Sequence, residues 1–337
     1  DFTVKAYQKT PEAKLLQVAV SKTLKISYPK LRLDITSDAN VLDLGQTVNF
    51  KIKLENQEDF VIENLSVTAA PDPDVFNLGT AKSTAKTKTS LTNISQSAGQ
   101  SVVWDEKTSP ALAGLKPGET RDFDFQISLK KSLSPIVHKN SGQVKFSASY
   151  SEKVITPRSA RDPDPSADDS PDVAVKTFIV SRVWRAPLVS DLRLILTPRY
   201  FTDDGDQLGR GSLPPRVNKE TKYWLFVNVF NSVNDLKDVS AGLSLSSGVT
   251  WTGKSTVSTG EPWTVDASGA LVWRVGDFKA SPNSLSAGLE ISFKPVASQS
   301  GQEPLLVASS QASGYDLVVN KNLVRPGNKV TTRLSSG

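Results

Sequence analysis

Hydrophobic and polar positions alternate along the stretch from Leu213 to Trp251, and this stretch shows the plan of the chain most fully. In the run YWLFVNVFN at residues 223–231, one face carries Tyr223, Leu225 and two valines, and the other carries aromatic residues. A period of two with aromatic and β-branched side chains is typical of a β-strand, and apolar residues on both faces indicate a central strand. A polar turn and the run VSAGLSL at 239–245 complete a predicted hairpin.

The same plan occurs earlier in the chain. The run VNFKIKLEN at 48–56 is followed by a polar turn and by NLSVTAA at 64–70. Likewise LRLDI at 31–35 corresponds to LRLILTP at 192–198, and two later alternating runs match each other. Internal repetition of an all-β unit predicts tandem immunoglobulin-like antiparallel β-sandwiches.

A chain of 337 residues is long for one sandwich and sufficient for two or three modules of about 100–150 residues. The repeat predicts a first module at residues 30–183 and a second at 184–337. Residues 1–29 resemble the last strands of the first module, at 143–152 and 172–183, and more weakly the run at 305–324 of the second. They are therefore expected to be either closing strands of a preceding repeat or exchanged strands, and packing in cis and in trans both stay open.

Composition and charge exclude several functions. The chain has no cysteine, and so it can form no disulfide, thiolate nucleophile or cysteine-ligated metal site. Its net charge of +5 comes from 40 basic and 35 acidic residues that are interspersed, with Lys130-Lys131 as the longest purely basic run. A nucleic-acid-binding protein concentrates its basic residues on one face, so no nucleic-acid partner is expected. No run of about 18 apolar residues predicts a membrane span within this chain.

The second half of the chain resembles a known family. The residues that carry the resemblance are Leu213-Pro214-Pro215, Tyr223-Trp224, the turn at 231–235, the step at 248–251 and Val272-Trp273. They are similar to the conserved-repeat, immunoglobulin-like domains found in tandem on large bacterial surface proteins, especially those of small-genome candidate-phylum bacteria. The resemblance covers residues 192–324, and the first module matches in outline. It implies an exported, extracellular protein of the bacterial cell surface with no known catalysis.

Few residues are candidates for chemistry. His138 is the only histidine, which excludes a histidine-cluster metal site. Asp203, Asp204 and Asp206 surround Gly205 and could form half of a calcium loop, because calcium prefers several carboxylate oxygens on a tight turn. The glutamate that would complete a calcium hand is missing, and a plain Asp-Gly turn is the alternative. Calcium is thus a possible cofactor, and no other cofactor is expected.

Two further residues are candidates for carbohydrate chemistry. Trp263 lies between Pro262 and Thr264 in a predicted turn, where an exposed ring could stack on a sugar. Trp251 and Trp273 lie in strand patterns and are expected in the core. Asn93-Ile94-Ser95 matches the glycosylation sequon in a predicted loop.

These observations favour a structural protein over an enzyme. The leading hypothesis is a segment of a bacterial cell-surface protein that forms a stalk, a filament or a surface layer through its repeats and through strand exchange. Its expected partners are further copies or neighbouring repeats of the same surface protein. The alternative is an adhesin or carbohydrate-binding module with a glycan or host-surface ligand. An enzyme would need catalytic residue types that the chain lacks.

Overall fold

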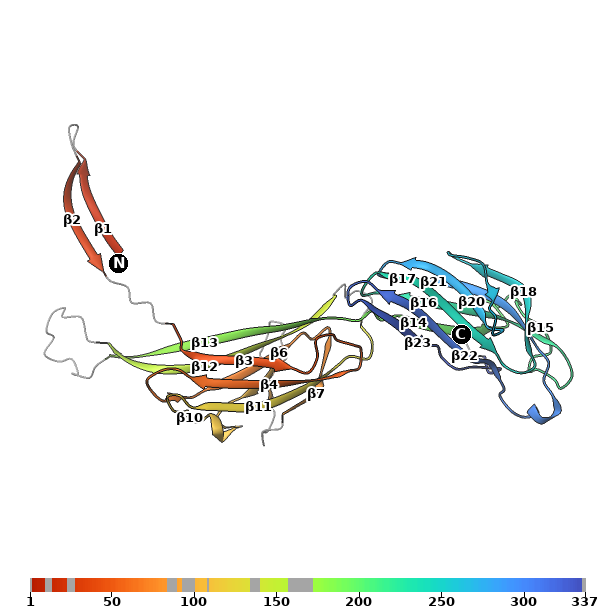
Figure 1. The fold of residues 1–337 in the computed structure, drawn as a ribbon, viewed down its shortest axis with the longest axis horizontal. Helices are drawn as coiled ribbons and strands as arrows, with labels where there is room; N and C mark the ends of the chain where they lie inside the picture. Colours follow the sequence, from red (N-terminus) through yellow and green to blue (C-terminus); the bar gives the residue numbers. More distant parts are fainter. Residues whose placement is uncertain are drawn as a thin grey trace.

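The structure, a computed structural model, describes residues 2–9, 14–22, 28–83, 90–92, 101–107, 109–133, 140–156 and 172–334. Regular structure in these ranges is β-strand, apart from two single-turn 3-10 helices, η1 (Pro110–Leu112) and η2 (Ala297–Gln299). Neither helix is long and apolar enough to cross a membrane. The predicted all-β fold is confirmed, and it consists of antiparallel sheets packed as sandwiches (Figure 1).

Within the described residues, the first sandwich contains nine main strands and one small pair. They are β3 (Leu31–Ser37), β4 (Thr47–Asn56), β6 (Ser66–Pro71), β7 (Phe76–Ser83), β8 (Ser90–Thr92), β9 (Ser101–Trp104), β11 (Thr120–Leu129), β12 (Ser141–Thr156) and β13 (Asp172–Pro187), with the pair β5 (Ile62–Glu63) and β10 (Gly114–Leu115). One sheet has the order β3-β4-β11-β7 and the other β13-β12-β6-β9-β8. Alternation along each strand turns one face of each sheet inward.

Aromatic rings join the two sheets of the first sandwich. Phe50 of β4 lies 5.8 Å from Phe125 of the same sheet and 5.3 Å from Phe146 of the opposite sheet, between ring centroids. Trp104, also from the opposite sheet, lies 5.5 Å from Phe125. All four rings are buried, so they form the centre of this core.

The second sandwich repeats this arrangement. Its strands are β14 (Arg193–Arg199), β15 (Arg210–Gly211), β16 (Thr221–Asn231), β17 (Leu236–Leu245), β18 (Val249–Val257), β19 (Thr264–Val265), β20 (Leu271–Phe278), β21 (Ser281–Phe293), β22 (Leu305–Asp316), β23 (Lys321–Pro326) and β24 (Val330–Thr331). One sheet has the order β14-β16-β21-β18, with β15 beside β16. The other has the order β19-β20-β17-β22-β23, with β24 beside β22.

The two sandwiches match strand by strand, and one buried asparagine marks the match. The strands β3, β4, β11 and β12 hold the places that β14, β16, β21 and β22 hold in the second sandwich. Asn56 ends β4 and Asn231 ends β16, and each is fully buried. The Nδ2 of Asn56 donates to the carbonyl of Leu115, as that of Asn231 does to Phe278. The predicted internal repeat therefore extends to single side chains.

Strand β13 leads from the first sandwich directly into the second. The N–H of Leu42, in the loop before β4, donates to the carbonyl of Pro187 at 2.9 Å, and the carbonyl of Leu42 accepts from Val189 at 2.8 Å. The cores also share residues across this junction. Val233 of the second sandwich packs in the first core, and Val41 packs against the second. The two sandwiches thus meet through backbone pairing and apolar contact.

A buried hydrogen-bond network strengthens the junction. The Nδ2 of Asn234 donates to the carbonyl of Leu188 at 2.7 Å and to Oδ2 of Asp316 at 3.0 Å. The same Oδ2 accepts from the N–H of Ser190 at 2.8 Å, and the hydroxyl of Ser190 donates to Asn231. A buried carboxylate is stable only when such donors satisfy it. An ion pair at 2.7 Å between Arg325 and Asp43 adds a contact near the surface.

The hydrophobic cores divide the chain between Leu188 and Val189. The boundary expected after residue 183 falls inside β13, where Trp184 and Ala186 still pack in or against the first core. The division lies five residues later because the strand continues to pair with β12 as far as Pro187.

A separate hairpin precedes the sandwiches. Strand β1 (Phe2–Lys9) pairs antiparallel with β2 (Lys14–Lys22), and this sheet contains no other described strand. Figure 1 shows it apart from both sandwiches. The described part of residues 1–29 therefore extends neither sandwich. Its role as closing strands of another repeat or as exchanged strands stays a prediction.

We expect Asn234→Ala to lower the free energy of unfolding by about 1–3 kcal/mol, because the change removes two buried donors and leaves the Asp316 carboxylate and the Leu188 carbonyl short of partners. Urea unfolding followed by tryptophan fluorescence measures this difference. Asn322→Ala is the matched control, since Asn322 is an exposed strand residue. Equal losses for both variants would contradict a stabilising network at the junction.

Candidate functional site

The outer face of the sheet β14-β16-β21-β18 carries half-buried aromatic residues. In β16 the odd-numbered residues from 223 to 229 are fully buried, because the other sheet of the sandwich covers them. The even-numbered Trp224, Phe226 and Phe230 point to the opposite side and are only partly buried. Strand β16 is central in its sheet as predicted, but its second apolar face lies on the surface of the protein.

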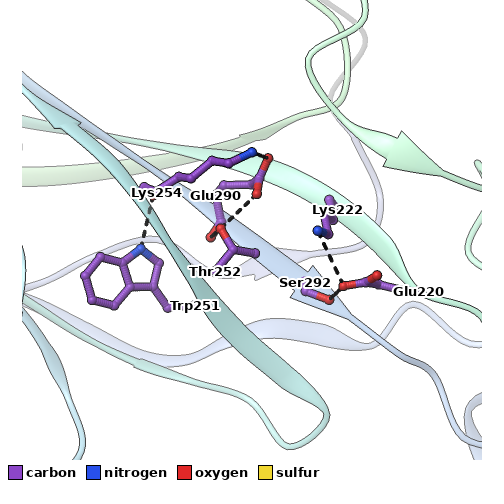
Figure 2. Close-up of polar contacts among 7 residues, drawn as sticks. All are labelled: Glu220, Lys222, Trp251, Thr252, Lys254, Glu290 and Ser292. Atoms are coloured by element: carbon purple, nitrogen blue, oxygen red, sulfur yellow. Dashed lines mark hydrogen bonds and ion pairs between the residues drawn. The ribbon is translucent and has the colours of Figure 1, made fainter.

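A buried carboxylate lies beside these rings. Glu290 of β21 pairs with Trp224 of β16 and is only 3 % exposed. The hydroxyl of Thr252 donates to its Oε2 at 2.8 Å, and the ammonium of Lys254 lies 3.4 Å from its Oε1. Figure 2 shows Lys254 running over the carboxylate from the neighbouring strand. The indole N–H of Trp251 donates to the carbonyl of Lys254 at 3.1 Å and so holds this turn of β18.

The surroundings of Glu290 favour its charged form. Burial alone disfavours the charge and would raise the pKa. The hydrogen bond from Thr252 and the positive charges of Lys254 and Lys222 outweigh burial, so the pKa of Glu290 lies below its ordinary value. The group is therefore an ionised hydrogen-bond acceptor at neutral pH.

Four cations around this face have acidic partners. The pairs are Arg193 with Asp191 at 3.7 Å, Arg199 with Asp203, Lys222 with Glu220 at 3.8 Å, and Lys254 with Glu290. Both arginines in these pairs also lie over aromatic rings, with Arg193 over Phe230 and Arg199 over Phe226. The face is thus polar and aromatic, and four of its positive charges are locally neutralised, while Arg210 of β15 lies exposed opposite Lys222.

The predicted calcium residues do not come together. Asp203, Asp204 and Asp206 are exposed around Gly205, whose φ of 93° fits a plain Asp-Gly turn. Asp203 is paired with Arg199. Among the described residues, no group of three or more histidine, cysteine, aspartate or glutamate side chains could hold a metal ion. The calcium expectation is corrected, because the turn directs its carboxylates to solvent and to an arginine.

Trp263 is buried, contrary to expectation. It is 4 % exposed and packs in the second core, with its ring 6.2 Å from that of Trp273. The turn at residues 260–263 folds back over β20, where Glu261 N–H bonds the carbonyl of Arg274. The prediction that Trp263 exposes a ring for stacking on a sugar is therefore wrong. Trp273 is fully buried and Trp251 partly buried, as core residues would be.

Two other sequence candidates, Asn93 and His138, lie outside the described residues. Glu290 and Trp224 were not among the predicted site residues. One signal was present: Glu290 is the single charged residue in the otherwise apolar alternation of GLEISF, at a position opposite the Tyr-Trp pair. Cross-strand register, which decides that Glu290 meets Trp224, cannot be obtained from one strand alone.

Glu290→Gln should lower stability at neutral pH by about 1–2 kcal/mol, because a neutral amide accepts weaker hydrogen bonds than a carboxylate and loses the contact with Lys254. A carboxyl whose pKa is depressed by folding stabilises above its unfolded pKa and loses this effect as pH falls through its folded value. The difference between wild type and variant should therefore shrink in acid. Urea unfolding at a series of pH values measures it, and a difference independent of pH would refute the ionised carboxylate.

Comparison with known proteins gives distant likeness in fold. No family model and no curated protein sequence matches the chain. Among solved structures, a partial N-terminal region of an enterococcal surface protein is similar at 10 % identity, covering 94 % of this chain and 98 % of that one, with a TM-score of 0.28. The full-length major pilin SpaD of Corynebacterium diphtheriae has 12 % identity over 80 % of this chain and 59 % of that one, with a TM-score of 0.28.

A third similar structure is AvmM, described as catalysing macrocyclisation in alchivemycin A biosynthesis. It has 9 % identity, covers 52 % of this chain and 95 % of that one, and has a TM-score of 0.24. The chain's own sheets show an all-β fold of several sandwich-like units, and its similarity to bacterial surface proteins is distant.

Proposed function

We propose that this chain is a structural segment of a bacterial cell-surface protein, in which two sandwiches held at a fixed angle act as a spacer. One observation carries the proposal: the junction is built from backbone pairing, shared core residues and a buried polar network. Domains joined by flexible linkers move relative to one another by default. A junction without a linker supports a role that depends on geometry.

The course of the chain through each sandwich also supports a spacer. In the first sandwich, Leu31 begins β3 beside Asn56, and Pro187 ends β13 beside Ser141, at the other end of the strands. In the second sandwich β14 begins at the junction, and β24 pairs with the opposite end of β22 from Asp316. The chain thus enters each sandwich at one end and leaves it at the other, as a series of spacers requires.

The proposal extends to location and partners. The resemblance of residues 192–324 to surface repeats implies an extracellular protein. As partners, further copies of the chain associate with it to form a stalk, a filament or a surface layer. Light scattering of the purified chain tests it, since oligomers would support self-association and a clean monomer would reduce the role to that of a spacer.

The fixed angle can be tested by measuring a distance across the junction. The chain has no cysteine, so Lys53→Cys and Thr250→Cys, both at exposed strand positions, introduce the sole sites for spin labels. We expect a narrow distance distribution by pulsed electron paramagnetic resonance. Adding Asn234→Ala and Arg325→Ala should broaden it, because both changes remove contacts across the junction. A broad distribution in the chain without these two changes would refute the spacer.

A further inference from the structure

We infer that the exit end of the second sandwich, formed by the loops at 200–220 and 294–304, binds the entry end of the first sandwich of a second copy. The entry end is formed by the loop at 57–61. This inference rests on the self-association proposed above and names the surfaces that carry it. A head-to-tail contact between copies produces a ring where its rotation closes and an open filament where it does not.

The exit end has an apolar cavity. In Figure 1 this end lies beside β15, on the side of the second sandwich away from the first. The cavity has a volume of about 730 Å³, and most of its lining comes from the two loops. Four prolines line it, namely Pro214, Pro215, Pro295 and Pro304. Three large apolar side chains at or next to these prolines are exposed, namely Leu213, Val296 and Leu305. Exposed apolar surface around a cavity is typical of a site that another protein covers.

The first sandwich shows what covers such an end. Its loop between β3 and β4, at 38–46, is the counterpart of the loop at 200–220, which joins β14 to β16. There Val41 packs against the second core, and the carbonyl of Leu42 accepts from the N–H of Val189 at 2.8 Å. The exit end is therefore the counterpart of a surface that, in the first sandwich, holds the entry end of another sandwich.

The loop after the buried asparagine supplies the other half of the contact. In the second sandwich this loop follows Asn231, and its Val233 packs in the core of the first sandwich. The loop at 57–61 follows Asn56 in the same way, and its Val61 is exposed. The first sandwich thus presents an exposed valine in the loop that corresponds to the one the second sandwich inserts at the junction.

The charges of the two surfaces are complementary. The cavity is lined by two cations and one acid, Arg216, Arg333 and Glu303, and so has a net charge of +1. Glu303 lies 3.7 Å from Arg333, whereas Arg216 is exposed and has no ion pair with another described residue. The loop at 57–61 contains Glu58 and Asp59 and no cation. Charge therefore favours contact of an exit end with an entry end over contact of two exit ends.

Sedimentation velocity of the full chain at a series of concentrations tests this contact. We expect oligomers whose share rises with concentration. Leu213→Asp at the exit end and Val61→Asp at the entry end should each weaken association about tenfold or more, because each places an unpaired carboxylate in an apolar contact. An equimolar mixture of the two variants should form dimers and no larger species, because each pair retains one intact exit end and one intact entry end.

A matched control and a second variant keep the result interpretable. Ile179→Asp also changes an exposed apolar residue, but it lies in the middle of β13, and it should leave association unchanged. If Leu213→Asp does not fold, Val296→Asp replaces it at the exit end. The inference is overturned if the chain stays monomeric, if the folded variants associate as the wild type does, or if their mixture forms no dimers. A monomer would leave the spacer with its fixed junction standing, and oligomers that persist in the variants would leave self-association through another surface.

Discussion

The buried contacts between Asn234, Asp316 and the segment from Leu188 to Ser190 are the constraint on which the molecule depends. Each sandwich has its own aromatic core and would satisfy its strands without the other. The carboxylate of Asp316 is fully buried, and its donors Ser190, Asn234 and Val318 lie in the second sandwich. The same amide of Asn234 also donates to the carbonyl of Leu188, the last residue of the connecting strand in the first core. The relative position of the two sandwiches is therefore specified by this hydrogen bond together with the apolar contacts of Val41 and Val233.

The two faces of strand β16 have different surroundings in the second sandwich. The odd-numbered residues of β16 build the core, while the even-numbered residues form a surface with Glu290 from β21. This is a consequence of the period of two: one side of the strand packs in the core and the other lies at the surface without a change in backbone. Two arginines cover part of its aromatic surface, since Arg193 lies over Phe230 and Arg199 over Phe226.

Sequence patterns predicted the strands and the repeat well, since alternation at 48–56 and 223–231 depends only on local order and produced β4 and β16. They failed where the outcome depends on tertiary contacts. Trp263 sits next to a proline in a polar turn, yet the turn folds back and buries its ring. Three neighbouring aspartates suggested a cation, but the turn directs them outward. Glu290 resembled any solvent-facing strand residue until register placed it against Trp224.

The long pairing of β12 with β13 has a mechanical consequence. The two strands are in register from Ser141 to Thr156, and β13 is also the segment that continues into the second sandwich. Tension applied along the two sandwiches pulls β13 parallel to its own axis, whereas its hydrogen bonds to β12 run across that axis. The bonds are then sheared together instead of being opened one at a time. Resistance to pulling is a property of the rate of unfolding, so a modest equilibrium stability is compatible with a strand that is slow to yield.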